Sequence, residues 1–354
     1  MMAVTDDINI RIVNKVGRIT LTRPKALNAL SYEMCLAIED VLDEWIEGNE
    51  VELILIDAEG DRAFCAGGDI AQLYETGKAG DYEYGRKFWS DEYRLNAKIT
   101  NCPIPYVAIM DGITMGGGVG ISAHGSDRIV TERSMIAMPE GGIGLVPDVG
   151  GSFILSCAPG YLGEYLAMTG YRMNAGDAVL AGFADVQVAI SDLDALKSAI
   201  EKAGDISVLA NFAGPPDAPS LAPHMEAIDR HFSKNSAVEV LKSLEEEAKE
   251  DGSDWANETI KLLRRSCPLS VACAFEMIRR IRGKKSVEEA LAMEYRFTHR
   301  SMSDGELIEG IRAQIIDKDR NPQWHTARLE DVSQEQIAKM LAPLGERELE
   351  FPLN

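Results

Sequence analysis

Three glycine-rich turns, each directly after a predicted strand, constrain this chain more than any other feature. They are AFCAGGDI (63–70), MDGITMGGGVGIS (110–122) and PEGGIGLVPDVGGS (139–152). Tight turns alone explain one or two glycines in each. Three in succession, Gly116–Gly118, open a predicted helix and favour a ligand that approaches the backbone closely, with packing as the alternative.

The segments around these turns alternate between strand and helix patterns. The predicted strands cover 8–13, 17–22, 51–60, 104–112, 127–132 and 135–140, and the predicted helices cover 31–45, 82–100 and a stretch from Gly117. Strands that alternate with helices predict a layered α/β core.

Beyond about residue 185 the chain changes character. Its longer segments carry apolar residues at helical spacing, and the Pro-rich stretch 212–223 is typical of a surface loop. We therefore expect a core over 1–190 and a mostly helical C-terminal region over 191–354.

Composition excludes several classes of partner. The formal charge of −21 over 354 residues argues against nucleic acid or an anionic membrane, but not against a small anion such as CoA. The six cysteines show neither disulfide nor zinc spacing, so we expect reduced thiols and no metal. The N-terminus lacks a signal-like apolar core and no run is long enough to span a bilayer, which predicts a cytoplasmic protein.

The glycine turns do not match the common phosphate or nucleophile motifs. A dinucleotide fingerprint read from Gly116 or Gly142 fails at its last glycine, and His124 stands where a nucleophile elbow requires glycine. What remains is the use of bare amides. A helix N-terminus at Gly117 and a turn at Gly68 could aim two N–H groups at one carbonyl oxygen, forming an oxyanion hole.

With RPKALNAL (23–30) added, the order and spacing of these motifs resemble the crotonase, or enoyl-CoA hydratase/isomerase, superfamily over about residues 8–190. The resemblance implies a spiral of ββα turns that binds an acyl-CoA. The thioester oxygen would lie between the amides of Gly68 and Gly117. CoA would be part of the substrate, and no separate cofactor is expected.

Within the superfamily the chain is most similar to the 3-hydroxyisobutyryl-CoA hydrolases. Hydratases hold water between two glutamates, and the first of those positions is Gly120 here. The second is retained as Glu140, with Asp148 eight residues on as in the hydrolases. DEYRLN (91–96) also matches and offers Glu92 as a substrate-binding carboxylate.

The tail extends this resemblance through EYR (294–296) and 309–324. One departure is that Glu306 and Leu307 replace the usual Asp-Phe pair, which affects packing more than chemistry.

Glu140 is the carboxylate expected to act on the thioester, either as the nucleophile or as the base that activates water. Asp148 would bind the substrate's 3-hydroxyl or orient water, and its structural alternative is a helix cap. The alternative for Glu92 is a solvent-facing helix residue. The resemblance places CoA along Lys25, Ala26, Leu27, Ala66, Gly67, Asp69 and Ile70, with Lys25 near the phosphates and amides around Ala66 near the adenine.

The expected activity is hydrolysis of a short 3-hydroxyacyl-CoA, most like 3-hydroxyisobutyryl-CoA to 3-hydroxyisobutyrate and CoA in valine catabolism. One alternative is an enoyl-CoA hydratase or isomerase, and another is a CoA-ester-binding protein without catalysis. The acyl group stays open, because one methyl in an apolar pocket changes discrimination by only about 1–3 kcal/mol. A homo-oligomer is compatible with the family, whose members often form trimers, although the helical tail could cover that surface.

Overall fold

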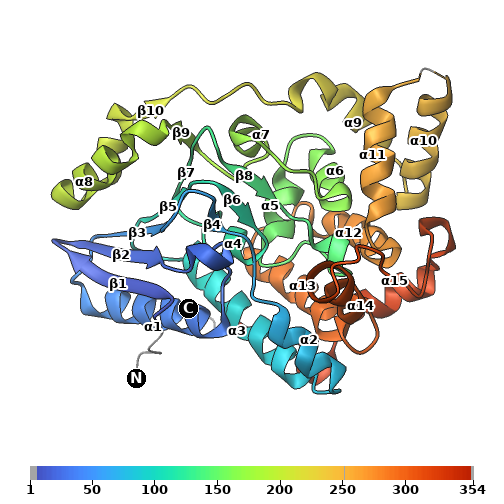
Figure 1. The fold of residues 1–354 in the computed structure, drawn as a ribbon, viewed down its shortest axis with the longest axis horizontal. Helices are drawn as coiled ribbons and strands as arrows, with labels where there is room; N and C mark the ends of the chain where they lie inside the picture. The colour runs from blue at the N-terminus through green and yellow to red at the C-terminus, as the bar shows by residue number, and fades with distance from the viewer. Residues whose placement is uncertain (1–5, 251, 352–354) are drawn as a thin grey trace. The chain divides into compact units, whose positions relative to one another are not determined.

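The computed structural model describes residues 6–250 and 252–351, which form two compact units, and Figure 1 traces the chain through both. The first unit comprises 6–69, 91–137 and 172–222. The second comprises 70–90, 138–171 and the described residues from 223 onward. The chain is therefore grouped differently from the boundary expected at residue 190, because 172–222 supplies the last strands of the sheet while 138–171 belongs with the C-terminal helices.

A seven-stranded sheet is the frame of the first unit, in the order β1–β2–β3–β5–β7–β9–β10. Its strands are β1 (Ile8–Val13), β2 (Val16–Leu21), β3 (Leu53–Ala58), β5 (Tyr106–Met110), β7 (Asp127–Val130), β9 (Val186–Val188) and β10 (Ala213–Gly214). Neighbours from β2 to β9 are parallel, and the two edge strands are antiparallel. The expected hairpin of β1 and β2 is confirmed. The loop predicted over 212–223 contains β10 and the start of a 3-10 turn, Ala222–His224.

A second, parallel sheet has the order β4–β6–β8, with β4 (Ala63–Cys65), β6 (Ile113–Met115) and β8 (Met135–Ala137). Each of its strands directly follows a strand of the large sheet, so the chain visits the two sheets in turn. This alternation is the repeated strand pair of the expected spiral. Each short strand then leads into one of the three glycine-rich turns.

Helices cover both faces of the large sheet. On one face Val16, Leu53 and Leu55 pack with α8 (Leu193–Ala203). On the other face Trp45 of α1 (Tyr32–Gly48) lies against Gly17, where an added Cβ would be 2.5 Å from the indole ring. Figure 1 shows α1 and α8 on opposite sides of β1–β3. The remaining helices of this unit are α4 (Gly117–Gly120) and α7 (Ala175–Leu180), and α3 (Glu83–Thr100) passes into it from the second unit.

A buried ionic cluster lies between this sheet and α8. Asp57 accepts hydrogen bonds from Arg18 at 2.8 Å and from Thr20 at 2.7 Å, and its carboxylate is 2.9 Å from Lys197 Nζ. Arg18 also ion-pairs with Glu201. Burial acts to raise the pKa of Asp57, but the charges of Lys197 and Arg18 outweigh it, and the pKa lies below its ordinary value.

The second unit is helical. Its helices are α2 (Ala71–Lys78), α5 (Gly151–Cys157), α6 (Leu162–Thr169), α9 (Met225–Phe232), α10 (Ala237–Glu250), α11 (Asp254–Arg265), α12 (Pro268–Ile281), α13 (Val287–Ser301), α14 (Leu307–Ile311) and α15 (Gln334–Leu341). The segment 305–319, one of those with apolar residues at helical spacing, forms α14 followed by a π-helical turn, Arg312–Ile316.

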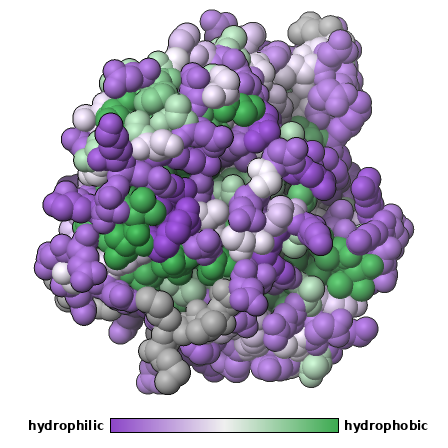
Figure 2. Space-filling view, turned by 60° about the vertical axis from the view of Figure 1, so that its left-hand side comes forward, coloured by the Kyte–Doolittle hydropathy of each residue, from purple (hydrophilic) through white to green (hydrophobic). Residues whose placement is uncertain are grey.

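Hydrophilic residues predominate on the face that Figure 2 shows, around separate hydrophobic areas. The most exposed large apolar side chains in the described part of the chain are Ile12, Ile315 and Ile316, each at about 40%. The latter two lie in the π-helical turn, where the extra residue shifts the helical phase. None of the helices in 6–250 and 252–351 has the length and apolar character required to cross a membrane.

Replacing Asp57 by asparagine should reduce the free energy of unfolding by about 3 kcal/mol at pH 7, because Arg18 would lose the more buried of its two charge partners and Lys197 would lose its pair with Asp57. The lowered pKa means that this stabilisation is present above the ordinary value near 4 and disappears as pH falls through the folded-state value. Urea unfolding of both proteins at pH 7 and pH 3 measures the effect. Asp43→Asn, at a half-exposed pair with Lys98, is the control and should lower the free energy of unfolding by less than about 0.5 kcal/mol. If Asp57→Asn lowered the free energy of unfolding equally at both pH values, this account would be contradicted.

Candidate active site

The first unit brings Gly68, Gly117 and Glu92 together. A Cβ added to Gly117 would be 3.3 Å from the N atom of Gly68 and 2.9 Å from Glu92 Oε1. Among the described residues, no backbone carbonyl accepts a hydrogen bond from the amide of Gly68 or Gly117. A side chain at position 117 would therefore press against the Gly68 amide and the Glu92 carboxylate.

Close backbone packing explains why residue 118 is a glycine. A Cβ on Gly118 would collide with the carbonyl oxygen of Cys65 at the end of β4. Gly116 has a positive φ of 49° and precedes the first residue of α4. Close packing therefore explains Gly118, and the approach of a ligand at Gly117 stays a prediction.

Glu92 is buried, with 4% of its surface exposed, on α3. The solvent-facing alternative considered from the sequence is wrong. Its charge adds to the effect of burial in raising the pKa of Cys35 on α1. A buried carboxylate beside Gly117 can contact a ligand that reaches these amides.

The two predicted CoA-binding segments of the first unit lie side by side. The N–H of Ala66 donates to the carbonyl of Leu27 at 3.0 Å, and Leu30 forms a bridge with Gly68. Asn28 stabilises this arrangement, because its Nδ2 donates to the carbonyls of Glu59 at 3.0 Å and Ala63 at 2.8 Å.

The other predicted CoA-binding positions differ in exposure and contacts. Lys25 and Ala26 are exposed on a short 3-10 turn, and Gly67 has a positive φ of 117°. Asp69 accepts a hydrogen bond from Arg23 at 3.1 Å, a contact that sequence reasoning missed. Ile70 caps α2 and belongs to the second unit.

One of the amides expected near the adenine has a partner within the protein. Because the N–H of Ala66 is already bonded to Leu27, that amide cannot donate to an adenine. Its carbonyl is the group of Ala66 that could contact the exocyclic amine of the base.

Glu140 begins a 3-10 turn, Glu140–Ile143, in the second unit and is 6% exposed. The C-terminal helices hold this turn. The N–H of Cys267 donates to the carbonyl of Gly141 at 2.8 Å. Gly310 of α14 packs closely on Ile143, and a Cβ added to Gly310 would collide with the carbonyl of Ile143. A rigid support of this kind fixes the carboxylate's position.

The departure noted at Glu306 lies at the same place. A Cβ on Gly144, which closes the Glu140 turn with φ 79°, would be 2.7 Å from the backbone of Glu306. Glu306 Oε1 accepts from the N–H of His325 at 3.0 Å. Glu306 therefore packs against the turn that carries Glu140, and the effect of the departure on packing stays a prediction.

Asp148 is 4% exposed and precedes two residues with positive φ, Val149 and Gly150. The helix-cap alternative for Asp148 is wrong, because α5 begins at Gly151 with Gly150 as its N-cap. Glu294 of α13 instead accepts from the N–H groups at the start of α5. Sequence analysis did not assign Glu294 a role, although the EYR segment that contains it was part of the resemblance.

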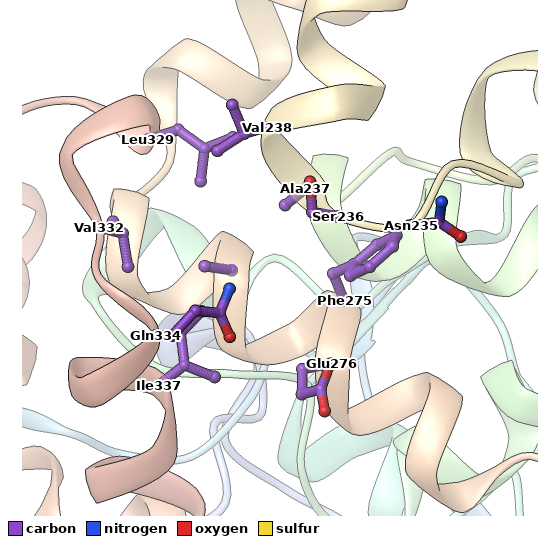
Figure 3. Close-up of a pocket in the computed structure, with 11 residues that line it drawn as sticks. Asn235, Ser236, Ala237, Val238, Phe275, Glu276, Leu329, Val332, Gln334 and Ile337 are labelled. Carbon is purple, nitrogen blue, oxygen red and sulfur yellow. The ribbon is translucent and has the colours of Figure 1, made fainter.

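A separate cavity of about 100 Å³ lies in the second unit (Figure 3). It is lined by residues at the start of α10, by Phe275 and Glu276 of α12, and by Gln334 and Ile337 of α15. None of the predicted site residues lines it, and it is smaller than the pockets that hold drug-sized ligands. Within 6–250 and 252–351, no three His, Cys, Asp or Glu side chains gather as a metal site requires.

A family model described as enoyl-CoA hydratase/isomerase matches residues 16–341. The chain belongs to the enoyl-CoA hydratase/isomerase family. Among its relatives in this family is the mitochondrial 3-hydroxyisobutyryl-CoA hydrolase of Rattus norvegicus, 42% identical over 95% of this chain and 88% of the relative.

Solved structures of the family agree with the fold over almost the whole chain. A crystal structure of an enoyl-CoA hydratase from Rhodobacter sphaeroides 2.4.1 has a TM-score of 0.93 and 47% identity, covering 98% of this chain and all of that one. A carnitinyl-CoA dehydratase from Mycobacterium thermoresistibile has a TM-score of 0.92 and 38% identity, covering 98% and 99%. The expected crotonase-like α/β fold with its helical C-terminal region is confirmed.

Gly117→Val should abolish activity on a CoA thioester, by about a hundredfold or more, while the protein stays folded. The valine would occupy the space beside Gly68 N and Glu92 Oε1. Activity and circular dichroism are measured together. Gly48→Val is the matched control, since the Cβ there meets only the Glu50 side chain at 3.9 Å; a Gly117→Val enzyme with normal turnover would refute the role of this amide.

Proposed function

We propose that this protein hydrolyses short 3-hydroxyacyl-CoA thioesters, with 3-hydroxyisobutyryl-CoA as its preferred substrate. The observation that carries the proposal is the near-full-length similarity to a 3-hydroxyisobutyryl-CoA hydrolase. The residues support it, because Glu140 and Asp148 are both present and Gly120 has no side chain for hydratase chemistry.

In this proposal the thioester oxygen accepts hydrogen bonds from the amides of Gly68 and Gly117. Negative charge builds on that oxygen when the carbonyl carbon is attacked. Fixed N–H donors stabilise this charge without any reorganisation at the moment of reaction. Their lack of backbone acceptors among the described residues supports the assignment.

Glu140 acts on the same carbonyl by one of two routes. As a nucleophile, its carboxylate oxygen bonds to the acyl carbon, the C–S bond breaks and CoA leaves as a thiolate that takes up a proton. Water then hydrolyses the acyl-Glu140 anhydride to the free acid. As a base, Glu140 removes a proton from water, the resulting hydroxide attacks the carbon, and the proton passes to the departing sulfur.

Asp148 and Glu92 serve the acyl group. Asp148 binds the 3-hydroxyl or orients the hydrolytic water, and Glu92 contacts the substrate beside Gly117. Both carboxylates are buried, which suits recognition of a hydroxyl in a site that excludes bulk water. CoA lies along Lys25–Leu27 and the 66–70 turn, with exposed Lys25 near its phosphates.

Enoyl-CoA hydration is the second candidate, because the Rhodobacter sphaeroides structure at 47% identity is described as an enoyl-CoA hydratase. Gly120 argues against it in this chain. Hydration requires a second acid/base group opposite Glu140, and glycine supplies none.

Assembly and location stay predictions. A homo-oligomer is compatible with the family, although the helical tail could cover the surface that such an assembly would use. The cytoplasmic location expected from the sequence is also untested, and the rat relative is named as mitochondrial.

The wild-type protein should release free thiol from 3-hydroxyisobutyryl-CoA and 3-hydroxypropionyl-CoA, and should leave crotonyl-CoA absorbance unchanged. A thiol-release assay over a small acyl-CoA panel, run beside the crotonyl-CoA assay, measures both. Rapid loss of crotonyl-CoA without thiol release would favour hydration. Tight binding of the esters with no turnover would favour the non-catalytic alternative.

Glu140→Gln should lower kcat by about a hundredfold or more and leave acyl-CoA binding nearly unchanged, because the amide is neither a nucleophile nor a base. The rate of thiol release gives kcat, and titration calorimetry gives the affinity for the acyl-CoA. Glu276→Gln, at a half-exposed pair with Arg280, is the control and should behave as wild type. Near-normal hydrolysis by Glu140→Gln would exclude both routes.

A further inference from the structure

Glu294 lies within α13 and its side chain is completely buried. Oε2 accepts a hydrogen bond from the N–H of Gly150 at 2.8 Å, and Oε1 accepts one from the N–H of Ser152 at 3.1 Å. The hydroxyl of Ser152 is also hydrogen-bonded to Oε1. One carboxyl group from the C-terminal region therefore satisfies three polar groups at the start of α5.

These contacts hold a turn that its own sequence does not favour. Val149 and Gly150 have φ values of 53° and 77°. This left-handed region suits glycine but is unfavourable for a β-branched residue, so the conformation of Val149 depends on contacts that impose it. Gly150 has no side chain with which to cap α5, and Glu294 takes over that task. Asp148 directly precedes Val149, so the direction of its carboxylate depends on the same turn.

A second completely buried glutamate of this unit has a different environment. Glu164 on α6 ion-pairs with Arg282 at 2.7 Å and lies 3.8 Å from Arg279. The main influences on Glu294 are instead burial, its hydrogen bonds to Gly150 and Ser152, and the charge of Asp148. Burial raises the pKa of Glu294 to about 8, and the charge of Asp148 adds to the rise. The Ser152 hydroxyl can donate to the ionised carboxylate or accept from the neutral acid, so the contact persists in both states.

We propose that Glu294 is a positioning residue, which fixes the turn 148–150 so that the Asp148 carboxylate faces the 3-hydroxyacyl group. This inference rests on the proposed function, because Asp148 needs such placement only if the protein acts on that substrate. It also gives the EYR segment a chemical role. The C-terminal helices then contribute to substrate recognition through the Asp148 turn.

A double-mutant cycle between Glu294 and Asp148 tests this coupling. Glu294→Leu keeps most of the side-chain volume and removes all three contacts. It should lower kcat/KM for 3-hydroxyisobutyryl-CoA by about ten- to a hundredfold. In an Asp148→Asn background the same change should lower kcat/KM by no more than about two- to threefold, since no carboxylate remains to be placed.

Glu294→Gln is the conservative variant. Its amide oxygen can accept from the N–H and the hydroxyl of Ser152, whereas its amide nitrogen then faces the N–H of Gly150 and cannot accept from it, so it should recover part of the activity lost in Glu294→Leu. Glu164→Gln is the matched buried control, and any loss it causes should be equal in both backgrounds. Equal losses from Glu294→Leu in both backgrounds, or a folded Glu294→Leu enzyme with wild-type kcat/KM, would overturn the inference.

Hydrogen exchange provides a readout that does not depend on activity. Amides in a peptide covering 148–157 should exchange at least about tenfold faster in Glu294→Leu than in wild type, with no such change in Glu164→Gln. Unchanged exchange in this peptide would show that Glu294 does not hold the turn. If wild type hydrolysed no acyl-CoA, the proposed function would fail, and the exchange comparison would still decide the structural part of the inference.

Discussion

The parallel pairing of β4, β6 and β8 is the constraint on which the arrangement of the glycine-rich turns after β4 and β6 depends. Carboxyl ends of parallel strands lie at one edge of a sheet, so all three strands end at that edge, β4 at Cys65, β6 at Met115 and β8 at Ala137. The segments that follow β4 and β6 contain the amides of Gly68 and Gly117, and the segment that follows β8 leads to Glu140. Close backbone packing of Gly118 against Cys65 keeps the segments after β4 and β6 in contact.

Much of this was predictable because strands and glycine turns are local properties of the sequence. The hairpin of β1 and β2, the strands before each turn and the helices α1 and α3 follow from hydrophobic periodicity. The convergence of Gly68, Gly117 and Glu92 does not, since it depends on how β4, β6 and α3 pack in three dimensions. Glu92 illustrates the limit, because a lone helix glutamate gives no indication of burial without the motif around it.

The contacts that were missed connect residues far apart in the sequence. Glu294 caps α5 across more than a hundred residues, and the carbonyl of Leu27 accepts from the N–H of Ala66, one of the amides expected near the adenine. The same long-range packing regroups the chain, so that 138–171 joins the C-terminal helices. A family tail that at first looks like an accessory to the core therefore supports both carboxylate-bearing turns, through Gly310 and Glu294.

Burial of the Glu294 carboxyl also changes the number of protons that the protein takes up when it folds. The formal charge of −21 counts this group as ionised, whereas a pKa raised to about 8 by burial leaves it mostly neutral at pH 7. The unfolded chain would ionise it above about pH 4.3. Folding at neutral pH therefore takes up a proton at this position, and the contribution of Glu294 to stability decreases as pH rises from that value to about 8. The measured enthalpy of unfolding should accordingly depend on the ionisation enthalpy of the buffer.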